Sequence, residues 1–244
     1  MKNIFKIVYQ NFLELLFPSN YKCMFCGRDI DKDSPVPYCE DCKNQMPFNQ
    51  GNRCKICDSQ ITDESEVCDH CKDHRKAFDK ALSAMIYEGK VKSLVLKFKN
   101  DNAKYLAPKM AKIIFNYICE FDIKFDVIIP VPLSAKSMKR RHYNQSALIA
   151  HELSKLTSIP ETDTALAKCK ETQHQKELGF ADRQRNLHGA FKVTDKEAIF
   201  KKNVLLVDDV ITTGATANEC CKALKKYCNK VYVVSFARSE LKNK

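Results

Sequence analysis

Four Cys-x-x-Cys pairs constrain the first third of this chain more strongly than any other feature. They form two quartets, C-x2-C-x12-C-x2-C and C-x2-C-x10-C-x2-C, made by Cys23, Cys26, Cys39 and Cys42 and by Cys54, Cys57, Cys68 and Cys71. A Cys-x-x-Cys pair can turn both sulfurs onto one ion, and two pairs complete the tetrahedron that zinc prefers. Because four thiolates leave no open position for water, the spacing predicts two structural Zn2+ ions.

The segment that carries the quartets is poor in apolar runs, so it cannot build a core and needs such a cross-link. We therefore predict a double zinc-binding module over residues 20–77. The spacing leaves open whether the four pairs combine sequentially, interleaved or nested, and His70 or His74 could replace a cysteine. A disulfide framework is the alternative, which the odd total of 13 cysteines and the lack of a secretion signal disfavour.

Residues 1–19 predict a helix, because apolar residues recur there at helical spacing until Pro18. Gln10, Asn11 and Glu14 interrupt any secretory core, and the segment is too short and too polar to span a bilayer. We expect a cytoplasmic protein without a transmembrane segment. The basic, apolar helix packs on the body of the protein or, as the alternative, contacts a membrane surface.

From residue 78 onward, strand and helix patterns alternate, which predicts a parallel α/β sheet and a second domain over 78–244. Strand patterns are predicted at 81–87, 126–131, 204–207 and 231–236, and helical patterns at 91–99, 106–118, 146–156 and 215–227. The polar stretch 168–188 predicts a long loop.

Val204 to Thr216 reads VLLVDDVITTGAT. A buried strand delivers Asp208 and Asp209 to its carboxyl end, the edge at which open α/β sheets bind ligands. Carboxylates there can accept hydrogen bonds from ribose hydroxyls or hold a hydrated Mg2+. A turn of small residues at a helix N-terminus follows and suits a phosphate group; it consists of Thr212, Thr213, Gly214, Ala215 and Thr216. An ordinary capped helix would explain the threonines but not the paired acids.

This segment resembles, along its whole length, the motif of type I phosphoribosyltransferases that binds 5-phosphoribosyl-1-pyrophosphate (PRPP). The resemblance implies a type I phosphoribosyltransferase-like parallel sheet flanked by helices, with a small N-terminal zinc-binding module. It also implies that the two acids hold the ribose 2′- and 3′-hydroxyls, that the turn cradles the 5′-phosphate, and that Mg2+ accompanies PRPP. The motif does not specify the acceptor.

Further segments are similar to the ComF family of competence proteins, which join a cysteine module to such a domain. They are Leu16-Phe-Pro, Ile129-Pro-Val-Pro-Leu133, Arg140 to Gln145, and Thr172 to Phe191. The chain departs from the family at His142, where glycine is usual, and a side chain there disfavours positive φ. The resemblance implies a role in the uptake or use of single-stranded DNA, beside DNA-uptake machinery at the inner face of the membrane.

A basic strip supports binding of an anion, because residues 127–151 contain no acid. The strip carries Lys136, Lys139, Arg140 and Arg141. Beside Pro132 of the Pro-Val-Pro loop, it can meet pyrophosphate or a nucleic-acid backbone, and Tyr143 offers a ring for stacking on bases. Lys99, near a predicted helix end, can also reach phosphate. A merely solvated basic loop is the alternative.

Three functions fit these patterns. If the chain is an enzyme, the resemblance implies that a nitrogen nucleophile displaces pyrophosphate from the anomeric carbon of PRPP. The catalytic residues would then be Asp208, Asp209 and Arg183, and residues 172–188, with Gln173 and Gln175, would form a lid. The alternatives are a non-catalytic PRPP-responsive adapter and a zinc-stabilised module that binds single-stranded nucleic acid.

Overall fold

The computed structural model describes residues 22–61, 64–170 and 187–240 of the chain. Contacts between Cα atoms divide the chain into two compact units, Met1–Met46 and Pro47–Lys244. The two units are described separately below.

Three of the sequence-based predictions lie outside the described residues. They are the helix at residues 1–19, most of the lid with Gln173 and Gln175, and the catalytic role of Arg183. Among the described residues, no helix has the length and apolar character that a membrane crossing requires.

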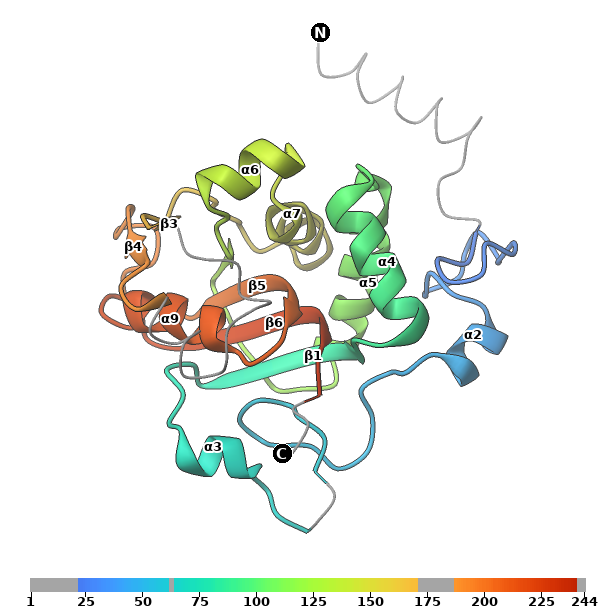
Figure 1. Ribbon diagram of the computed structural model, residues 1–244, viewed down its shortest axis with the longest axis horizontal. Coiled ribbons are helices and arrows are strands. Elements are labelled where there is room, and N and C mark those ends of the chain that lie inside the picture. Colours follow the sequence, from blue (N-terminus) through green and yellow to red (C-terminus); the bar gives the residue numbers. More distant parts are fainter. Residues whose placement is uncertain (1–21, 62–63, 171–186, 241–244) are drawn as a thin grey trace, which may run out of the picture. The chain divides into compact units, whose positions relative to one another are not determined.

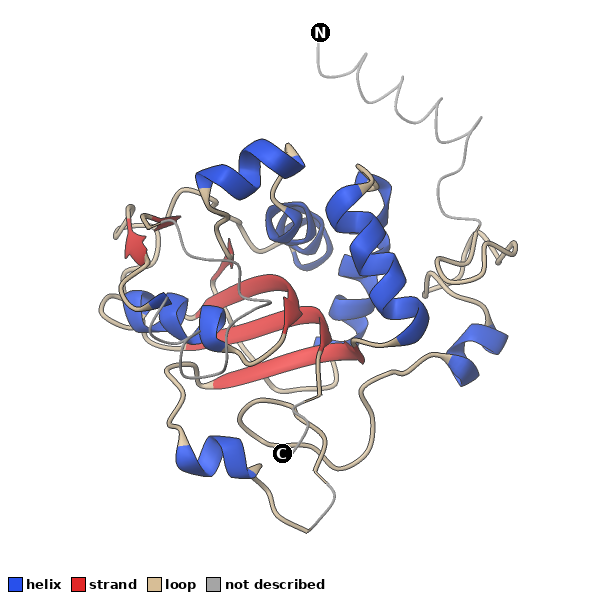
Figure 2. Cartoon of the chain, viewed as in Figure 1, coloured by secondary structure: helices blue, strands red, loops and turns tan. Residues whose placement is uncertain are grey.

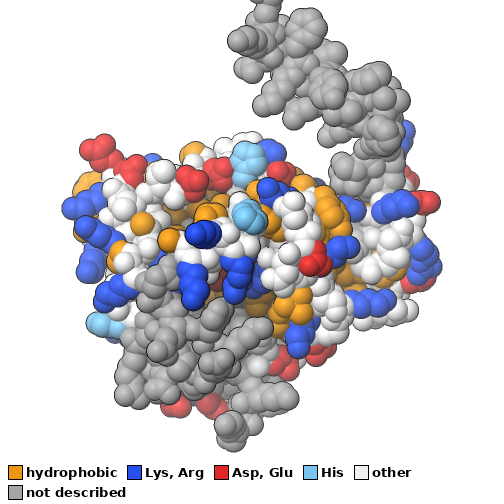
Figure 3. All heavy atoms as spheres, turned by 45° about the horizontal axis from the view of Figure 1, so that its top comes forward, with side chains coloured by type: hydrophobic (Ala, Val, Ile, Leu, Met, Phe, Trp, Pro, Cys, Tyr) orange, Lys and Arg blue, Asp and Glu red, His pale blue; other side chains and the backbone are white. Residues whose placement is uncertain are grey.

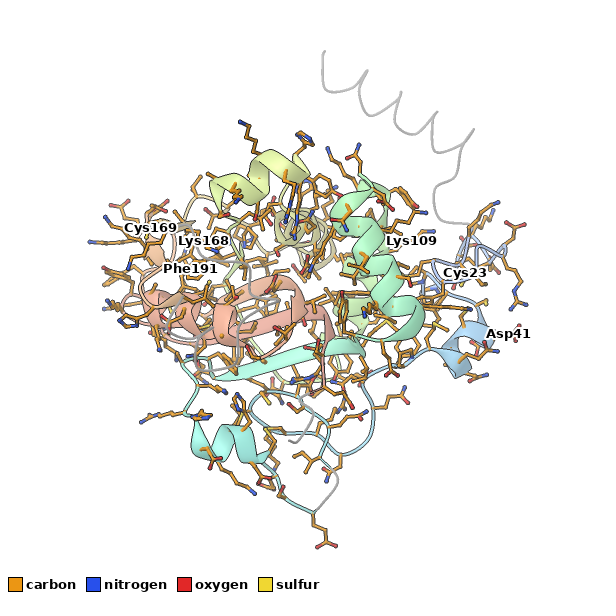
Figure 4. The ribbon with its side chains drawn as sticks, viewed as in Figure 1. Cys23, Asp41, Lys109, Lys168, Cys169 and Phe191 are labelled. Atoms are coloured by element: carbon orange, nitrogen blue, oxygen red, sulfur yellow. The ribbon has the colours of Figure 1, made fainter. Side chains whose placement is uncertain are left out.

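The first unit is organised around the first cysteine quartet. Its backbone turns at Gly27, which has φ +75° and donates its N–H to Cys23 O at 2.9 Å. Glycine adopts this left-handed conformation without steric cost, so the chain can turn directly after Cys26. The short helix α2 (Glu40–Gln45) starts after Cys39 and carries Asp41, which pairs with Arg28 at 2.6 Å (Figure 4).

The second unit contains a four-stranded sheet in the order β1-β6-β5-β2, with all neighbours parallel (Figures 1 and 2). The strands are β1 (Lys80–Ile86), β2 (Val127–Pro130), β5 (Val204–Ile211) and β6 (Val231–Arg238). Nearly all their residues are buried, because a parallel sheet is covered on both faces and its strands are therefore continuous apolar runs. The predicted parallel α/β fold is confirmed.

Helices cover the sheet, as the blue elements of Figure 2 show. The longer ones are α4 (Gly89–Asn100), α5 (Ala107–Ile118), α7 (Gln145–Thr157) and α9 (Ala215–Leu224). Helices α5 and α7 pack on each other and on the sheet. One apolar cluster contains α9 residues together with Val204 and Leu206 of β5, but not Leu205 or Val207. Alternate side chains of this part of β5 therefore point to opposite faces of the sheet.

Smaller elements lie around this core. They are α3 (Asp69–Asp73), the 3-10 turn η1 (Lys104–Leu106), α6 (Ala135–Arg141), and the antiparallel pair β3 (Leu166–Lys168) and β4 (Phe191–Val193). In Figure 4, Lys168 and Cys169 lie beside Phe191 of β4, and the Lys168 ammonium is 5.8 Å from the Phe191 ring centre.

The structure corrects several predicted boundaries. Strand β5 does not end at Val207 but continues to Ile211, because β6 keeps pairing with it after β2 has ended. The basic strip is not only loop, since α6 lies within it. The stretch predicted as a loop from residue 168 begins inside β3, and α9 ends at Leu224 rather than at residue 227.

The second cysteine quartet belongs to the second unit. Cys54, Cys57 and Cys71 are buried in the same apolar cluster as the α9 residues, and Ala81 N of β1 donates to Ile56 O at 2.8 Å. The boundary expected at residue 77 remains a prediction about domain organisation. In the structure the second quartet shares a core with the sheet, so it does not depend on zinc alone for burial.

Candidate functional site

Asp208 and Asp209 lie where β2 has ended and β5 pairs only with β6. Pro130 of β2 pairs with Val207, and no further β2 residue pairs with β5, whereas Asp208 still pairs with Ser235 of β6. The chain leaves β2 through Pro132, which cannot donate a ladder hydrogen bond. The end of β2 therefore opens the sheet edge beside Asp208 and Asp209, although both lie within β5 rather than after it.

Two helices supply partners for these carboxylates. Lys99, near the end of α4, places its Nζ 2.8 Å from Asp209 Oδ1. Ser146, in the first turn of α7, donates its hydroxyl to Asp208 Oδ1 at 3.0 Å, and Asp209 N donates to the same oxygen at 2.9 Å. The predicted residue Lys99 thus joins the site.

Burial and mutual repulsion set the charge of the pair. Burial, and then the charge of Asp209, raise the pKa of Asp208 to about 7, against the opposing effects of Lys99 and Ser146. For Lys99, burial works to lower the pKa, but attraction to Asp209 and Asp208 outweighs it and the pKa is raised. The site therefore holds one ion pair and a second carboxyl group poised to lose its proton near neutrality.

Beside the ion pair lie buried donors that lack partners. Arg141, the last residue of α6, donates from Nη1 to Gln145 Oε1 at 3.0 Å, but its Nε has no hydrogen-bond partner. Gln145 is 1% exposed, and its Nε2 is also unpartnered. The charge of Arg141 acts on Lys99, so the two cations share one environment. Buried donors without partners are costly, and an anionic ligand would satisfy them.

The predicted phosphate turn precedes α9. Gly214 is the N-cap residue with φ +74°, and it contributes no side-chain cap. Thr212 is exposed, Thr213 and Thr216 are half-buried, and Ala215 is buried. Strand β5 ends at Ile211, two residues after Asp209, and the turn begins at the next residue. The structure therefore brings the turn and the acids to one edge, where N–H groups and the helix dipole favour an anion.

The structure overturns one prediction about the basic strip. Tyr143 cannot stack on bases, because it is 7% exposed and its hydroxyl donates a hydrogen bond to Phe98 O. His142, whose side chain disfavours positive φ, nevertheless ends α6 in the left-handed conformation, with φ +64°. The exposed Lys136, Lys139 and Arg140 are on α6, and Figure 3 shows Lys and Arg side chains on the side that carries this helix.

The eight paired cysteines gather as two sequential quartets. Within each quartet all four sulfur atoms lie within 4.8 Å of one another, with Cys26 Sγ 3.7 Å from Cys39 Sγ and Cys57 Sγ 3.6 Å from Cys68 Sγ. A tetrahedral zinc ion with Zn–S bonds of about 2.3 Å requires sulfur separations of about 3.8 Å. Both quartets therefore fit structural zinc with four cysteine ligands and no open position.

A buried polar network attaches the second quartet to the sheet. Asp58, one residue after Cys57, is 3% exposed, and its Oδ2 accepts from Asn49 Nδ2, Ser83 N and Tyr117 Oη at 2.8 to 2.9 Å. Burial raises the pKa of Asp58 against these bonds. The network joins the quartet to β1 and α5.

The sequence analysis missed several residues of these sites. Ser146 directly follows the Asn-Gln pair of the segment that resembles the ComF family. That resemblance is the only sequence signal that could have pointed to Ser146 as a site residue. Gln145 belonged to the same pair but was given no role. Asp58 and the buried Arg238 carry no local pattern, because their partners are distant in sequence.

Comparison with known proteins matches the chain on both its parts. A family model described as a double zinc ribbon domain matches residues 12–72. Competence protein F of Haemophilus influenzae is 30% identical over 217 residues, covering 85% of this chain and 92% of the relative. DNA utilization protein YhgH of Escherichia coli (strain K12) is 24% identical, covering 70% and 77%. Among solved structures, a glutamine PRPP amidotransferase from B. subtilis, complexed with ADP and GMP, has 19% identity and a TM-score of 0.34. That match covers 54% of this chain and 25% of the other.

The parallel sheet flanked by helices, with its paired carboxylates and glycine turn, defines an α/β protein that also contains a double zinc ribbon. The parallel sheet and the zinc-binding module of the predicted fold class are both present. The chain belongs to the competence protein F family, because it shares 30% identity with that protein over most of both lengths.

Proposed function

We propose that the chain binds PRPP together with Mg2+ at the carboxyl edge of β5 and acts in the uptake or use of single-stranded DNA. The observation that carries the proposal is that Asp208 and Asp209, the second of which pairs with Lys99 of α4, stand only a few residues before the Thr212–Thr216 turn. The names of the relatives, a competence protein and a DNA utilization protein, support the biological role.

Each part of PRPP has a matching group in this site. The carboxylates accept hydrogen bonds from the ribose 2′- and 3′-hydroxyls, and the turn before α9 receives the 5′-phosphate. We assign the pyrophosphate to the cations Arg141 and Lys99, which share one electrostatic environment. Mg2+ supplies charge neutralisation of the pyrophosphate when it is bound. Ligand hydroxyls and cations favour ionised carboxylates, so binding should draw the Asp208 proton off.

Calorimetric titration of PRPP with Mg2+ into the zinc-loaded full chain tests the proposal. Wild type should bind, and the double variant Asp208→Asn/Asp209→Asn should not, because it cannot offer two charged acceptors. Asp122→Asn is a matched control, since Asp122 is an exposed aspartate of the same unit. A folded wild type that takes up no PRPP would sink the proposal.

An assay for pyrophosphate release distinguishes two functions of this chain, a transferase and a non-catalytic PRPP-responsive adapter. Binding that is followed by pyrophosphate release when single-stranded DNA or another nitrogen nucleophile is added identifies a transferase. PRPP binding without release under any acceptor identifies a PRPP-responsive adapter. In either case we propose a cytoplasmic location beside DNA-uptake proteins, as the family resemblance implies.

Binding of single-stranded DNA is a second function, favoured by the exposed cations of α6. Lys136, Lys139 and Arg140 line this short helix, which ends at Arg141 of the pyrophosphate side. Contacts of this kind release counterions, so affinity should fall steeply with salt. Replacing these three by Gln should weaken DNA binding and flatten its salt dependence. If the triple variant binds single-stranded DNA as wild type does, α6 is not the DNA-binding surface.

A further inference from the structure

Two aromatic side chains are exposed among the described residues, Tyr105 at 60% and Phe200 at 59%. Tyr105 lies in η1, shortly after α4, whereas Phe200 precedes the start of β5. Lys99, near the end of α4, reaches Asp209, so this end of the helix lies at the carboxyl edge of the sheet. Of the two exposed rings, only that of Tyr105 follows the helix end that contacts the paired carboxylates.

Lysine side chains lie beside the Tyr105 ring. Lys97 Nζ is 5.9 Å from the centre of that ring, a distance at which a cation and an aromatic face attract each other. The neighbouring Lys104 places its Nζ 5.0 Å from the ring centre of Tyr143. Residues 90–105 contain five lysines and a single acid, Asp101. The Tyr105 ring is therefore exposed within a positively charged surface.

This positive surface continues into α6. Tyr143, two residues after the end of α6, donates its hydroxyl to Phe98 O of α4, and the rings of these two residues are 6.1 Å apart. The chain that leaves α6 is thereby fixed against the end of α4, and Figure 1 shows both helices above the strands. Because residues 127–151 contain no acid, the cations of α6 extend the positive charge around Tyr105.

Apolar side chains are exposed on the same elements. Three of the four large ones exposed among the described residues are Leu96 of α4, Tyr105 of η1 and Met138 of α6. An exposed ring among cations suits a single strand of nucleic acid, because the ring stacks on a base while the cations meet the phosphates. A bilayer surface is also negative, but the exposed Lys92 and Lys97 interrupt the apolar face of α4 that it would need.

We propose that Tyr105 is a stacking platform for a base of single-stranded DNA, with Lys97 and Lys104 at the phosphates of the same strand. The inference rests on the second proposed function, the binding of single-stranded DNA, and names the residue that holds a base. It moves the stacking contact expected for the buried Tyr143 to the exposed ring beside it in the structure. A base within a duplex has no free face, so the surface prefers single strands.

Fluorescence anisotropy of the zinc-loaded full chain, with oligothymidylate and with an abasic strand of the same length, separates stacking from charge. Wild type should bind the strand with bases about tenfold more tightly. Tyr105→Ala should lose this preference, and Tyr105→Phe should keep it because a phenyl ring also stacks. Phe200→Ala is the matched control, since that ring is equally exposed with Lys201 Nζ 5.4 Å from its centre. This control should keep the preference.

The phosphate contacts are tested by the double variant Lys97→Gln/Lys104→Gln. Both strands carry phosphates, so this variant should bind both more weakly by the same factor and with a smaller dependence on salt. A change confined to the strand with bases would contradict the assigned phosphate contacts.

The remaining outcomes decide between this inference and the proposed function. If wild type binds both strands equally, or if Tyr105→Ala keeps the preference for bases, the inference is wrong. DNA binding itself still stands in that case, provided that the triple variant of α6 binds more weakly. If wild type binds neither strand, the inference and DNA binding both fail, and PRPP binding is judged by its dependence on Asp208 and Asp209.

Vesicles of anionic phosphatidylglycerol provide the last comparison. Wild type and Tyr105→Ala are sedimented with these vesicles and with neutral phosphatidylcholine vesicles. If Tyr105→Ala loses binding to the anionic vesicles and binds oligonucleotides as wild type does, the surface belongs to a membrane and the inference is overturned. Vesicle binding that does not change with Tyr105, together with the lost preference for bases, supports the assignment to DNA.

Discussion

Replacing Asp208 by Asn should stabilise the ligand-free protein, because it removes a half-buried negative charge next to a buried carboxylate. Burial and the charge of Asp209 raise the pKa of Asp208 to about 7. An asparagine keeps Oδ1, the atom that accepts from Ser146 Oγ and Asp209 N. The variant should therefore lose the repulsion without losing these hydrogen bonds.

The magnitude follows from the shift in pKa. A rise from 3.8 to about 7 is roughly 3 units, so ionised Asp208 lowers the free energy of unfolding by up to ~4 kcal/mol. Because the folded-state pKa is the higher one, this penalty is absent below about pH 4, grows as pH rises, and is constant above about pH 7. The advantage of Asp208→Asn should thus be about 2 kcal/mol larger at pH 8 than at pH 5.5.

Urea unfolding of the zinc-loaded protein, followed by circular dichroism at both pH values, measures this difference. The exposed Asp122→Asn is the control and should change stability little at either pH. If Asp208→Asn is no more stable than wild type at pH 8, or if its advantage does not grow with pH, then burial and the neighbouring carboxylate do not govern this site. A gain in stability together with lost PRPP binding would show that the site is tuned for its ligand.

Three further predictions test other parts of the structure. His142→Gly should raise stability by about 1 kcal/mol, because it relieves a left-handed residue; a lower melting temperature would contradict this. Cys71→Ser should lower the melting temperature of the α/β domain strongly and Cys26→Ser only slightly, because the second quartet shares the sheet's core; equal effects in calorimetry would refute that difference. Tyr117→Phe should cost about 1 to 3 kcal/mol in urea unfolding by removing a hydrogen bond to buried Asp58, and an unchanged midpoint would argue against this network.

The four strands of the parallel sheet were predictable from the sequence because each contains a continuous apolar run, whereas the short antiparallel pair β3 and β4 was not predicted. The residues at which the strands end were harder to predict. Strand β5 continues past its two acids because Ser235 and the residues after it in β6 keep pairing with it, a contact that no local pattern reveals. Helix α6 has no buried residue and so no periodic apolar face. Its one local mark is Ser134, which caps the helix by accepting from Ser137 N at 3.2 Å.

The charged residues of the candidate site were predictable from the sequence, but the residues that hydrogen-bond to them were not. Asp208, Asp209 and the glycine turn stand together in one segment, and the cysteine spacing indicates its own chemistry. By contrast, Ser146 reaches Asp208 across 62 positions of the chain, and Arg238 reaches Ser59 across 179. Such contacts depend on how strands and helices are ordered in space, which residue spacing does not encode.

The position of β6 has a consequence for how the protein reaches its native state. This strand lies between β1 and β5, and it is the last strand of the described chain. During synthesis β1 has no parallel partner until residues 231–238 have left the ribosome, and only then can Arg238 donate its hydrogen bond to Ser59 beside the second cysteine quartet. Such non-local pairing is slow and exposes strand edges. If the ribbon binds zinc early, that part of the nascent chain is already folded before β6 has been synthesised.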